Sequence, residues 1–337
     1  MRTTGRRQVL ACGAIFVVLL LGVRPAESRG RFHRGTIDQL LGLDVRPFAI
    51  GHHGVGTNRG EDPRKPIENT LASVRLALIA GVSVVEVDVQ LTRDGHVAVF
   101  HDDFLADFTC INRLTLAELH QREPEIPTLP GVLGEVRQFN ARPLRGLGIV
   151  ELKAASPLCD HDDTEEQAIV SAVTTVIRRM GMTDQVMLTS FSPALLFLAS
   201  IEAPEIARDL AISGLQFLDA SAIEALLGLP VTPIDKHTSV ALRWAEIGPI
   251  FRLPGYQAVA EVFSTAGIIG ARVVEADLSF LSSAGAPFVE ALHDLGLKAL
   301  GFTATSPAEW FFLESLGLDG IYTDDVPFGV QHQAPIP

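Results

Sequence analysis

The sequence predicts a single-domain (β/α)8 TIM barrel, and three observations support this fold. Short apolar segments of strand length alternate along the chain with longer segments of helical periodicity, which is typical of parallel strands joined by helical crossovers. About eight such strands can be counted, and polar residues repeatedly follow their ends, where a barrel of this kind has its active site. An open, doubly wound sheet would share the alternation, but no glycine-rich phosphate loop opens any of the helices.

Each expected strand is a short apolar run, and each expected helix has an identifiable start or stop. Thr70 precedes the first helical pattern and Gly81 follows it, as an N-cap and a C-terminal glycine do. Residues 214–270 do not follow the alternation clearly, and an insertion is expected there. The expected strands are 48–52, 84–89, 95–101, 147–153, 186–189, 210–212, 273–276, 298–302 and 320–324, and the clearest helices are 70–80, 165–180, 285–295 and 307–316.

The first 28 residues predict an export signal. Arg6 and Arg7 precede an apolar run over residues 9–23, and Ala26 and Ser28 form a small-residue cleavage site. The run is short for a membrane span, although an uncleaved anchor is the alternative. The paired arginines suggest the twin-arginine route. We therefore expect an exported protein, periplasmic or secreted.

The remainder of the chain predicts one barrel domain over residues 46–330, because no linker or change of composition divides it. The net charge of the whole chain is -13, and the signal segment carries four arginines, so the domain itself is more acidic still. This charge disfavours nucleic acid as a partner. It would also repel an anionic substrate unless a bound cation reversed the local charge. Membrane contact is expected only through the signal segment or a lipid substrate.

Two cysteines, Cys110 and Cys159, lie outside the signal segment. They could pair in an oxidising compartment, although two thiols in a large domain are more often packed or free.

Three acidic residues lie on expected strands and predict a metal site. Glu86 and Asp88 are two residues apart, so both side chains point to the same face, and Glu151 lies on another expected strand. Three carboxylates suit a hard cation such as Ca²⁺ or Mg²⁺. The alternative is that these acids pair with Lys153 or an arginine in salt bridges at the barrel mouth.

His52 and His101 each follow an expected strand near the carboxylate pair and predict proton transfer. Cleaving a P–O bond requires taking a proton from the attacking oxygen and giving one to the leaving alcohol, which two imidazoles can do. Lys153 shares a strand face with Glu151 and could stabilise charge on the phosphoryl oxygens. Its alternative role is the salt bridge just described.

An acidic run, Asp160–Asp163, precedes the helix expected over 165–180. It could bind a second cation, but acids suit a helix N-terminus, and Thr164 to Gln167 fits a capping box. We therefore expect a solvated helix start.

Taken together and in order, these segments resemble the glycerophosphodiester phosphodiesterase family over most of residues 46–328. The resemblance implies a TIM barrel, a divalent cation held by Glu86, Asp88 and Glu151, and acid–base roles for His52 and His101. It implies hydrolysis of glycerophosphodiesters to an alcohol and glycerol 3-phosphate. The matching segments are His52-x-Gly54, Glu68-Asn-Thr70-Leu71, Val85-Glu86-x-Asp88-Val89, Thr92-Arg-Asp94-Gly95, Phe100-His101-Asp102, Ile126-Pro-Thr-Leu129, Val150-Glu151-Leu-Lys153, Ser190-Phe-Ser192 and Asp319-Gly-Ile-Tyr-Thr-Asp324.

Three positions near the expected site concern the substrate. His53 stands where the family usually has an arginine, whose planar fork grips phosphate more firmly than imidazole does. Arg59, Arg64 or Lys65, in the following loop, could reach back to the site instead, and of these Arg59 is the expected substrate contact. Phe302 keeps an aromatic wall where the family tends to show tryptophan. We count all three as expected substrate contacts.

Two other functions fit the same residues. One is a phospholipase D-like or C-like enzyme that acts on intact lysolipids or sphingolipids, for which residues 251–256 would be the apolar loop at the barrel mouth. The other is a barrel that binds phosphodiesters without turnover.

Overall fold

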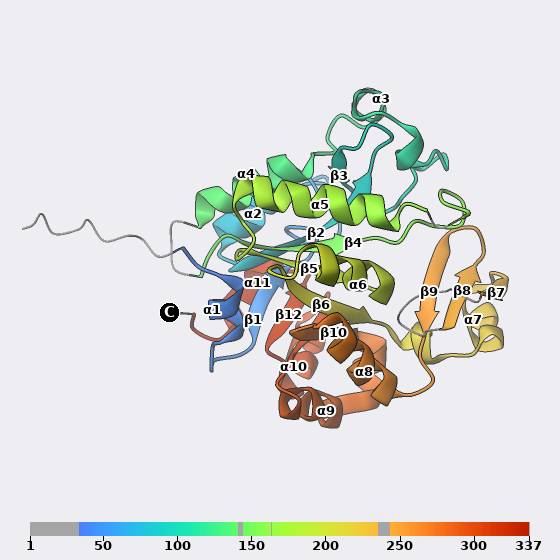
Figure 1. Cartoon of the computed structure of the whole chain (residues 1–337). Helices are drawn as coiled ribbons and strands as arrows, with labels where there is room; N and C mark the ends of the chain where they lie inside the picture. The colour runs from blue at the N-terminus through green and yellow to red at the C-terminus, as the bar shows by residue number, and fades with distance from the viewer. Residues whose placement is uncertain (1–33, 141–143, 163, 235–242, 337) are drawn as a thin grey trace, which may run out of the picture. The chain divides into compact units, whose positions relative to one another are not determined.

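Eight parallel strands close into a barrel in the computed structural model, which confirms the predicted fold (Figure 1). Each strand pairs in parallel with its two neighbours, and the ring closes where β1 pairs with β2. The barrel strands are β1 (Phe48–Gly51), β2 (Val84–Leu91), β4 (Leu147–Leu152), β5 (Val186–Ser190), β6 (Ala207–Ile212), β10 (Val273–Asp277), β11 (Lys298–Ala304) and β12 (Gly320–Thr323).

A helix follows each barrel strand and covers the outside of the ring. The prediction for the first of them is confirmed, since Thr70 caps α2 and Gly81 ends it in the left-handed conformation. The last predicted helices also form, although α9 starts earlier than expected and has a break at Gly285. The helices are α2 (Leu71–Ala80), α4 (Leu129–Phe139), α5 (Glu166–Met180), α6 (Pro193–Glu202), α8 (Val259–Ile269), α9 (Leu278–Asp294), α10 (Pro307–Ser315) and α11 (Val326–His332).

One expected strand is not part of the barrel. The segment predicted as a strand over 95–101 contains β3 (Val97–Val99), which pairs antiparallel with the end of β2. The turn between them is short, so the chain folds back before a crossover helix can form. Two short helices, η1 (Ile111–Arg113) and α3 (Leu116–Arg122), then lead to α4.

The expected insertion is present between β6 and α8. It contains η2 (Gly214–Phe217), α7 (Ala220–Leu227) and an antiparallel sheet of β7 (Val231–Ile234), β8 (Arg243–Ile247) and β9 (Phe251–Gly255). Figure 1 shows this sheet at the end of the barrel opposite α1 (Ile37–Leu41). Because the insertion follows the carboxyl end of β6, it stands at the end where polar residues leave the strands.

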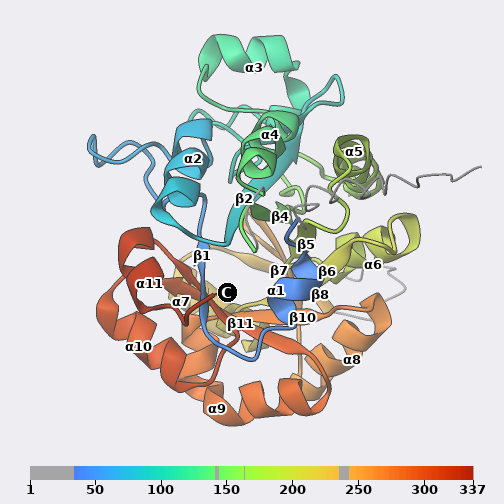
Figure 2. The ribbon, with the colours of Figure 1, turned by 90° about the vertical axis from the view of Figure 1, so that its left-hand side faces the viewer.

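The barrel interior is apolar at its amino-terminal end. Alternate residues of the strands pack either against the helices or against one another inside the ring, as the two-residue period of a strand requires. Ile37, Leu40 and Leu41 of α1 join the inner set and close this end, and Figure 2 shows α1 in front of the ring of strands. The inner apolar residues on the strands are Phe48, Ile50, Val84, Leu147, Ile149, Met187, Val273, Leu300 and Tyr322.

The structure describes residues 34–140, 144–162, 164–234 and 243–336. The predicted export signal, residues 1–28, lies outside these ranges. No helix within them is both long enough and apolar enough to span a bilayer.

Cys110 and Cys159 form a disulfide, with their Cα atoms 5.5 Å apart. The sequence had left this pairing open and favoured packed or free thiols. The bond joins the loop before η1 to the loop between β4 and α5, and Asn112 donates a side-chain hydrogen bond of 2.9 Å to the carbonyl of Cys159. The two loops are therefore fixed to each other beside the carboxyl end of β4.

Replacing both cysteines with alanine should lower the free energy of unfolding by roughly 2–4 kcal/mol, because the open chain gains conformational entropy when unfolded. Urea unfolding of the oxidised protein and the double variant measures the difference. Wild-type protein kept under a reducing agent should match the variant. Equal unfolding midpoints for oxidised and reduced protein would show that the bond adds no stability.

Candidate active site

Three carboxylates meet inside the carboxyl end of the barrel, as the sequence predicts. Glu86 and Asp88 project inward from β2, and Asp88 lies in register with Glu151 on β4. Their exposed fractions are 3 %, 0 % and 9 %. One oxygen from each lies within 4.8 Å of the others, close enough for a single cation to bind all three.

Lys153 lies within this cluster. Its Nζ atom is 2.9 Å from Oδ1 of Asp88 and 2.8 Å from Oε1 of Glu151. The salt bridge considered from the sequence is therefore present, and the ammonium group remains at the edge of the cluster. One lysine neutralises only part of the charge of three carboxylates.

The pKa values of the acids reflect this imbalance. Burial, followed by the charges of Asp88 and Glu151, raises the pKa of Glu86 well above its ordinary value. Burial also raises the pKa of Glu151 to about 8, although Lys153 opposes the shift. For Asp88, burial is outweighed by Lys153 and the nearby imidazoles, which hold its pKa well below the usual range. The raised pKa values favour the protonated forms of Glu86 and Glu151, and a bound cation would favour their ionised forms.

The donor set fits a hard divalent cation. Oxygen ligands from carboxylates are what Ca²⁺ and Mg²⁺ prefer. Oε1 of Glu86 is buried and has no hydrogen-bond donor within the described residues. An acceptor left without a partner in this position is one that a cation would satisfy.

His52 follows β1 and is held by a carboxylate. Its Nδ1 atom lies 2.8 Å from Oδ1 of Asp324, which follows the neighbouring strand β12. Burial, and then the adjacent His53, lower the pKa of His52, while the bond to Asp324 partly offsets them. The imidazole is therefore neutral around pH 7 and keeps Nε2 free for chemistry.

His101 reaches the same cluster by a different route from the one expected. It follows β3, the antiparallel strand that folds back on β2, and not a strand of the barrel. Its Nδ1 atom lies 2.6 Å from Oδ1 of Asp102. His101 also shares with His53 and Asp88 a group of possible ligand atoms within 4.8 Å of one another, so the hairpin brings it to the carboxylates.

His53 is buried between the other two imidazoles, with ring centroids 3.8 Å from His52 and 5.3 Å from His101. Its Nδ1 atom is 3.5 Å from Glu68 and its Nε2 atom is 3.1 Å from Asp88. Its φ angle is +48°, and its backbone N–H donates to Glu86. All three imidazoles thus have a carboxylate beside Nδ1.

Arg59 reaches the site from the loop after His53, as expected. Its Nη1 atom lies 3.1 Å from Asp102, and its Nη2 atom lies 3.4 Å from Nδ1 of His101. Its Nε atom lies 3.5 Å from Glu68, and about half of the side chain, 53 %, is exposed to solvent.

Phe302 lies on β11 in an aromatic cluster at the barrel mouth. Its ring stands edge-on to Phe191 at 5.8 Å and to Tyr322 at 6.1 Å. Tyr322 in turn stands edge-on to His52 at 6.2 Å. The predicted aromatic wall therefore continues from Phe302 to the imidazole.

Several residues of the site received no role from the sequence. Asn69 donates from Nδ2 to Oδ2 of Asp88 at 2.8 Å and accepts the backbone N–H of Asp88, so it fixes that carboxylate in two places. Asp102, Asp324 and Glu68 hold the imidazoles. All four lie within the motif segments, but the sequence alone did not show which of them would face a ring nitrogen or a ligand.

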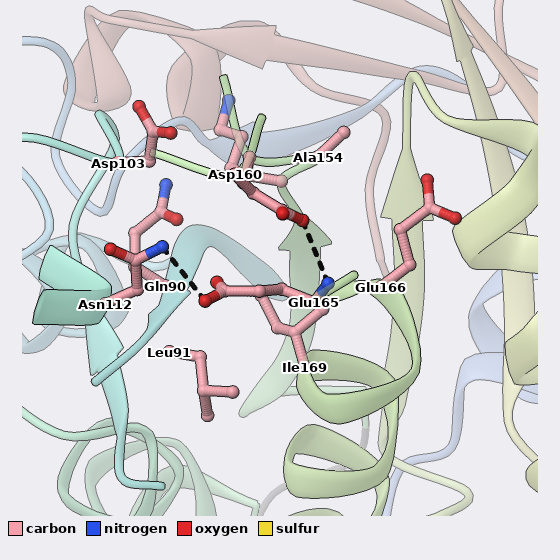
Figure 3. Close-up of a pocket in the computed structure, with 11 residues that line it drawn as sticks. Gln90, Leu91, Asp103, Asn112, Ala154, Asp160, Glu165, Glu166 and Ile169 are labelled. Carbon is pink, nitrogen blue, oxygen red and sulfur yellow. Dashed lines mark hydrogen bonds between the residues drawn. The ribbon is translucent and has the colours of Figure 1, made fainter. Parts of the chain in front are cut away.

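An acidic pocket opens beside Lys153, between η1 and the start of α5 (Figure 3). Asp103, Asp160 and Glu165 line it. Burial raises the pKa of Asp103 and of Glu165. Asn112 donates to Glu165 at 3.0 Å.

The acids of this pocket hold the loop before α5. Asp160 accepts the backbone N–H of Glu165 at 2.9 Å, and Asp103 accepts that of Ser156 at 2.6 Å. The capping box predicted at Thr164 is wrong: Glu165 is the N-cap residue and has no side-chain cap bond. Asp160 supplies the acceptor instead, because the loop brings its carboxylate over the first turn.

Comparison with known proteins places the chain among phosphodiesterases. The model of the glycerophosphoryl diester phosphodiesterase family matches residues 52–327. The chain is 42% identical over 85 residues to a probable glycerophosphodiester phosphodiesterase 1 of Mycobacterium tuberculosis, a match that covers 24% of this chain and 28% of that protein. It is 40% identical over 75 residues to a glycerophosphodiester phosphodiesterase of Caldanaerobacter subterraneus, covering 19% and 28%. The matches span little more than a quarter of these curated relatives.

Two solved structures share the fold. A putative glycerophosphoryl diester phosphodiesterase from Silicibacter pomeroyi has a TM-score of 0.63 and 23% identity, covering 88% of this chain and 96% of that one. A phosphodiesterase from Oleispira antarctica, solved in complex with the product sn-glycerol-3-phosphate, has a TM-score of 0.60 and 23% identity, covering 85% and 95%.

Replacing Asp324 with asparagine should lower the pKa of His52 further, because the carboxylate that stabilises the imidazolium is removed. NMR titration of the histidine ring signals measures this shift. The signal of His96, which is exposed on the turn before β3, serves as the internal control. An unchanged pKa of His52 would contradict the assigned contact.

Proposed function

The chain belongs to the glycerophosphoryl diester phosphodiesterase family, and from this premise we propose that it hydrolyses glycerophosphodiesters to an alcohol and glycerol 3-phosphate with the help of a divalent cation. The observation that carries the proposal is the convergence of two carboxylate-held imidazoles, His52 and His101, on a cluster of three carboxylates. This combination supplies proton transfer and charge neutralisation at one place.

Glu86, Asp88 and Glu151 would hold the cation, Ca²⁺ or Mg²⁺. When bound, it would offset the negative charge of the phosphodiester and polarise a phosphoryl oxygen. Asn69 keeps Asp88 in place for this role.

His52 suits the part of the general base. Its lowered pKa leaves it unprotonated at neutral pH, and Asp324 orients the ring so that Nε2 takes the proton of the attacking oxygen. His101, oriented by Asp102, would give a proton to the leaving alcohol. Two imidazoles held by separate carboxylates support this division of roles.

Two positively charged side chains, Lys153 and Arg59, are suited to bind the phosphate group of the substrate. Lys153 stands at the edge of the acid cluster and would stabilise charge on the phosphoryl oxygens. Arg59 is half-exposed beside His101 and would bind a second oxygen. Phe302 would border the glycerol or head group. His53 is buried between the catalytic imidazoles, so its contact with the substrate stays a prediction.

Export of the enzyme remains part of the proposal. The disulfide between Cys110 and Cys159 supports it, since such bonds persist mainly in oxidising compartments. The paired arginines of the signal segment favour the twin-arginine route.

Activity on intact lipids is a second candidate, and one observation favours it. The insertion at the catalytic end of the barrel exposes apolar side chains, with exposed fractions of 64 % for Leu226 and 52 % for Phe251. Tyr256, at the end of the predicted apolar loop, is buried and does not contribute to this surface.

Incubation with glycerophosphocholine and Ca²⁺ or Mg²⁺ should release glycerol 3-phosphate, and excess chelator should stop the release. An enzyme-coupled assay for glycerol 3-phosphate measures both. Faster turnover of lysolipid or sphingomyelin would favour the second candidate. Tight binding of glycerophosphocholine without product over hours would instead identify a binding protein, and full activity in chelator would remove the cation from the mechanism.

Replacing His52 or His101 with alanine should reduce kcat by about 10²- to 10⁴-fold, because each removes one proton transfer. The matched control is His96→Ala, which changes an exposed histidine outside the acid cluster and should keep wild-type activity. If neither variant lost activity while both remained folded, the imidazoles would have no part in the reaction.

A further inference from the structure

Two more carboxyl groups lie inside the barrel, outside the set that would hold the cation. Asp209 is on β6 and Glu275 is on the adjacent strand β10. Their exposed fractions are 0 % and 4 %. Neither residue has a role in the reaction described above.

The hydrogen bonds around this pair are incomplete when both acids are ionised. Thr189 on β5 donates to Oε1 of Glu275 at 2.7 Å. Within the described part of the chain, Oε2 of Glu275 and both oxygens of Asp209 have no hydrogen-bond donor. Buried polar atoms in folded proteins are rarely left in this state.

A proton between the carboxyl groups would complete the network. Two ionised carboxylates in contact inside a barrel repel each other and pay the full cost of desolvation, whereas a protonated one donates to its neighbour. Burial, then the charge of Glu275 and a hydrogen bond to it, raise the pKa of Asp209 well above its ordinary value. Burial also raises the pKa of Glu275, although the same hydrogen bond to Asp209 lowers it in part. The two carboxyl groups therefore favour holding one proton between them.

The pair lies close enough to the proposed general base for their charges to interact. The charge of His52 acts on Glu275, and Glu275 acts on Glu151 of the acid cluster. Tyr322 connects the pair to the site, because it interacts with Glu275, it is affected by the charge of Glu86, and its ring stands edge-on to His52. Loss of the shared proton would add a negative charge near the imidazole and favour its protonated form.

We propose that Asp209 and Glu275 share one proton at neutral pH and act as positioning residues, keeping a single negative charge near His52 so that this imidazole stays neutral. The role as positioning residues rests on the proposed function, but the shared proton does not. The pair touches no reacting atom in this account and acts only through charge and through Tyr322.

Infrared difference spectroscopy between wild type and Asp209→Asn tests the shared proton without any assay of activity. The wild-type protein, kept in saturating Ca²⁺ or Mg²⁺ near pH 7, should show the carbonyl band of a protonated carboxyl group, and the variant should lack it. Glu275→Gln should also remove or shift the band. The matched control is Glu135→Gln, a largely buried acid paired with Arg75, which should leave the band unchanged.

The stability of the variant gives a second measurement. A carboxyl group whose pKa is raised by folding stabilises the protein fully below its unfolded pKa, and this contribution is lost as pH rises through the folded pKa. Asp209→Asn has no such loss, so its Tm should rise relative to wild type as pH increases. The asparagine can still donate to Glu275, which preserves the packing.

The state of His52 completes the test. In Asp209→Asn its pKa, followed by NMR, should stay at the wild-type value near neutral pH, since the variant imitates the protonated pair. A wild-type spectrum without a protonated carboxyl band would overturn the shared proton. Loss of a bound metal ion in Asp209→Asn would also overturn it, because the pair would then be a cation site.

The band and the activity can fail separately. An active enzyme without the band would contradict only the shared proton, and an inactive enzyme with the band would contradict only the proposed function.

Discussion

The repulsion among buried carboxylates at the carboxyl end of the barrel is the constraint on which the site depends. Glu86, Asp88 and Glu151 point into one space from two neighbouring strands, and Lys153 is the one ammonium group in contact with them in the described structure. Such a cluster is stable only if acids remain protonated or if a cation is bound. This excess of negative charge would give a cation its affinity, and the bound cation would draw an anionic phosphodiester to an otherwise acidic protein.

The barrel surrounds this cluster from the amino-terminal side and from the sides. Apolar side chains and α1 fill the amino-terminal half, so water is excluded from below. The imidazoles are then fixed from the sides: β12 brings Asp324 to His52, and the hairpin of β2 and β3 brings His101 to Asp88. Because His52 and His101 are each held through Nδ1, the tautomer that leaves Nε2 available is the same for both, whereas Nε2 of His53 faces Asp88.

The sequence predicted the fold and the main site residues because their signals are local. Alternating strands and helices define the barrel, and the spacing of Glu86 and Asp88 puts them on one face. Contacts between distant segments were not predictable in this way. The antiparallel pairing of β3, the bond between Cys110 and Cys159, and the approach of Asp209 to Glu275 each depend on strand order and loop closure, which residue spacing does not encode.

Calorimetric titration of Ca²⁺ or Mg²⁺ into the metal-free protein, repeated in buffers of different ionisation enthalpy, tests the central claim most directly. Because the pKa values of Glu86 and Glu151 are raised, that of Glu151 to about 8, both acids must lose protons to bind a cation. Binding of one cation per chain at pH 7 should therefore release protons, and Glu151→Gln should reduce that release. Absence of binding, or binding without proton release, would contradict the claim that these carboxylates form the cation site.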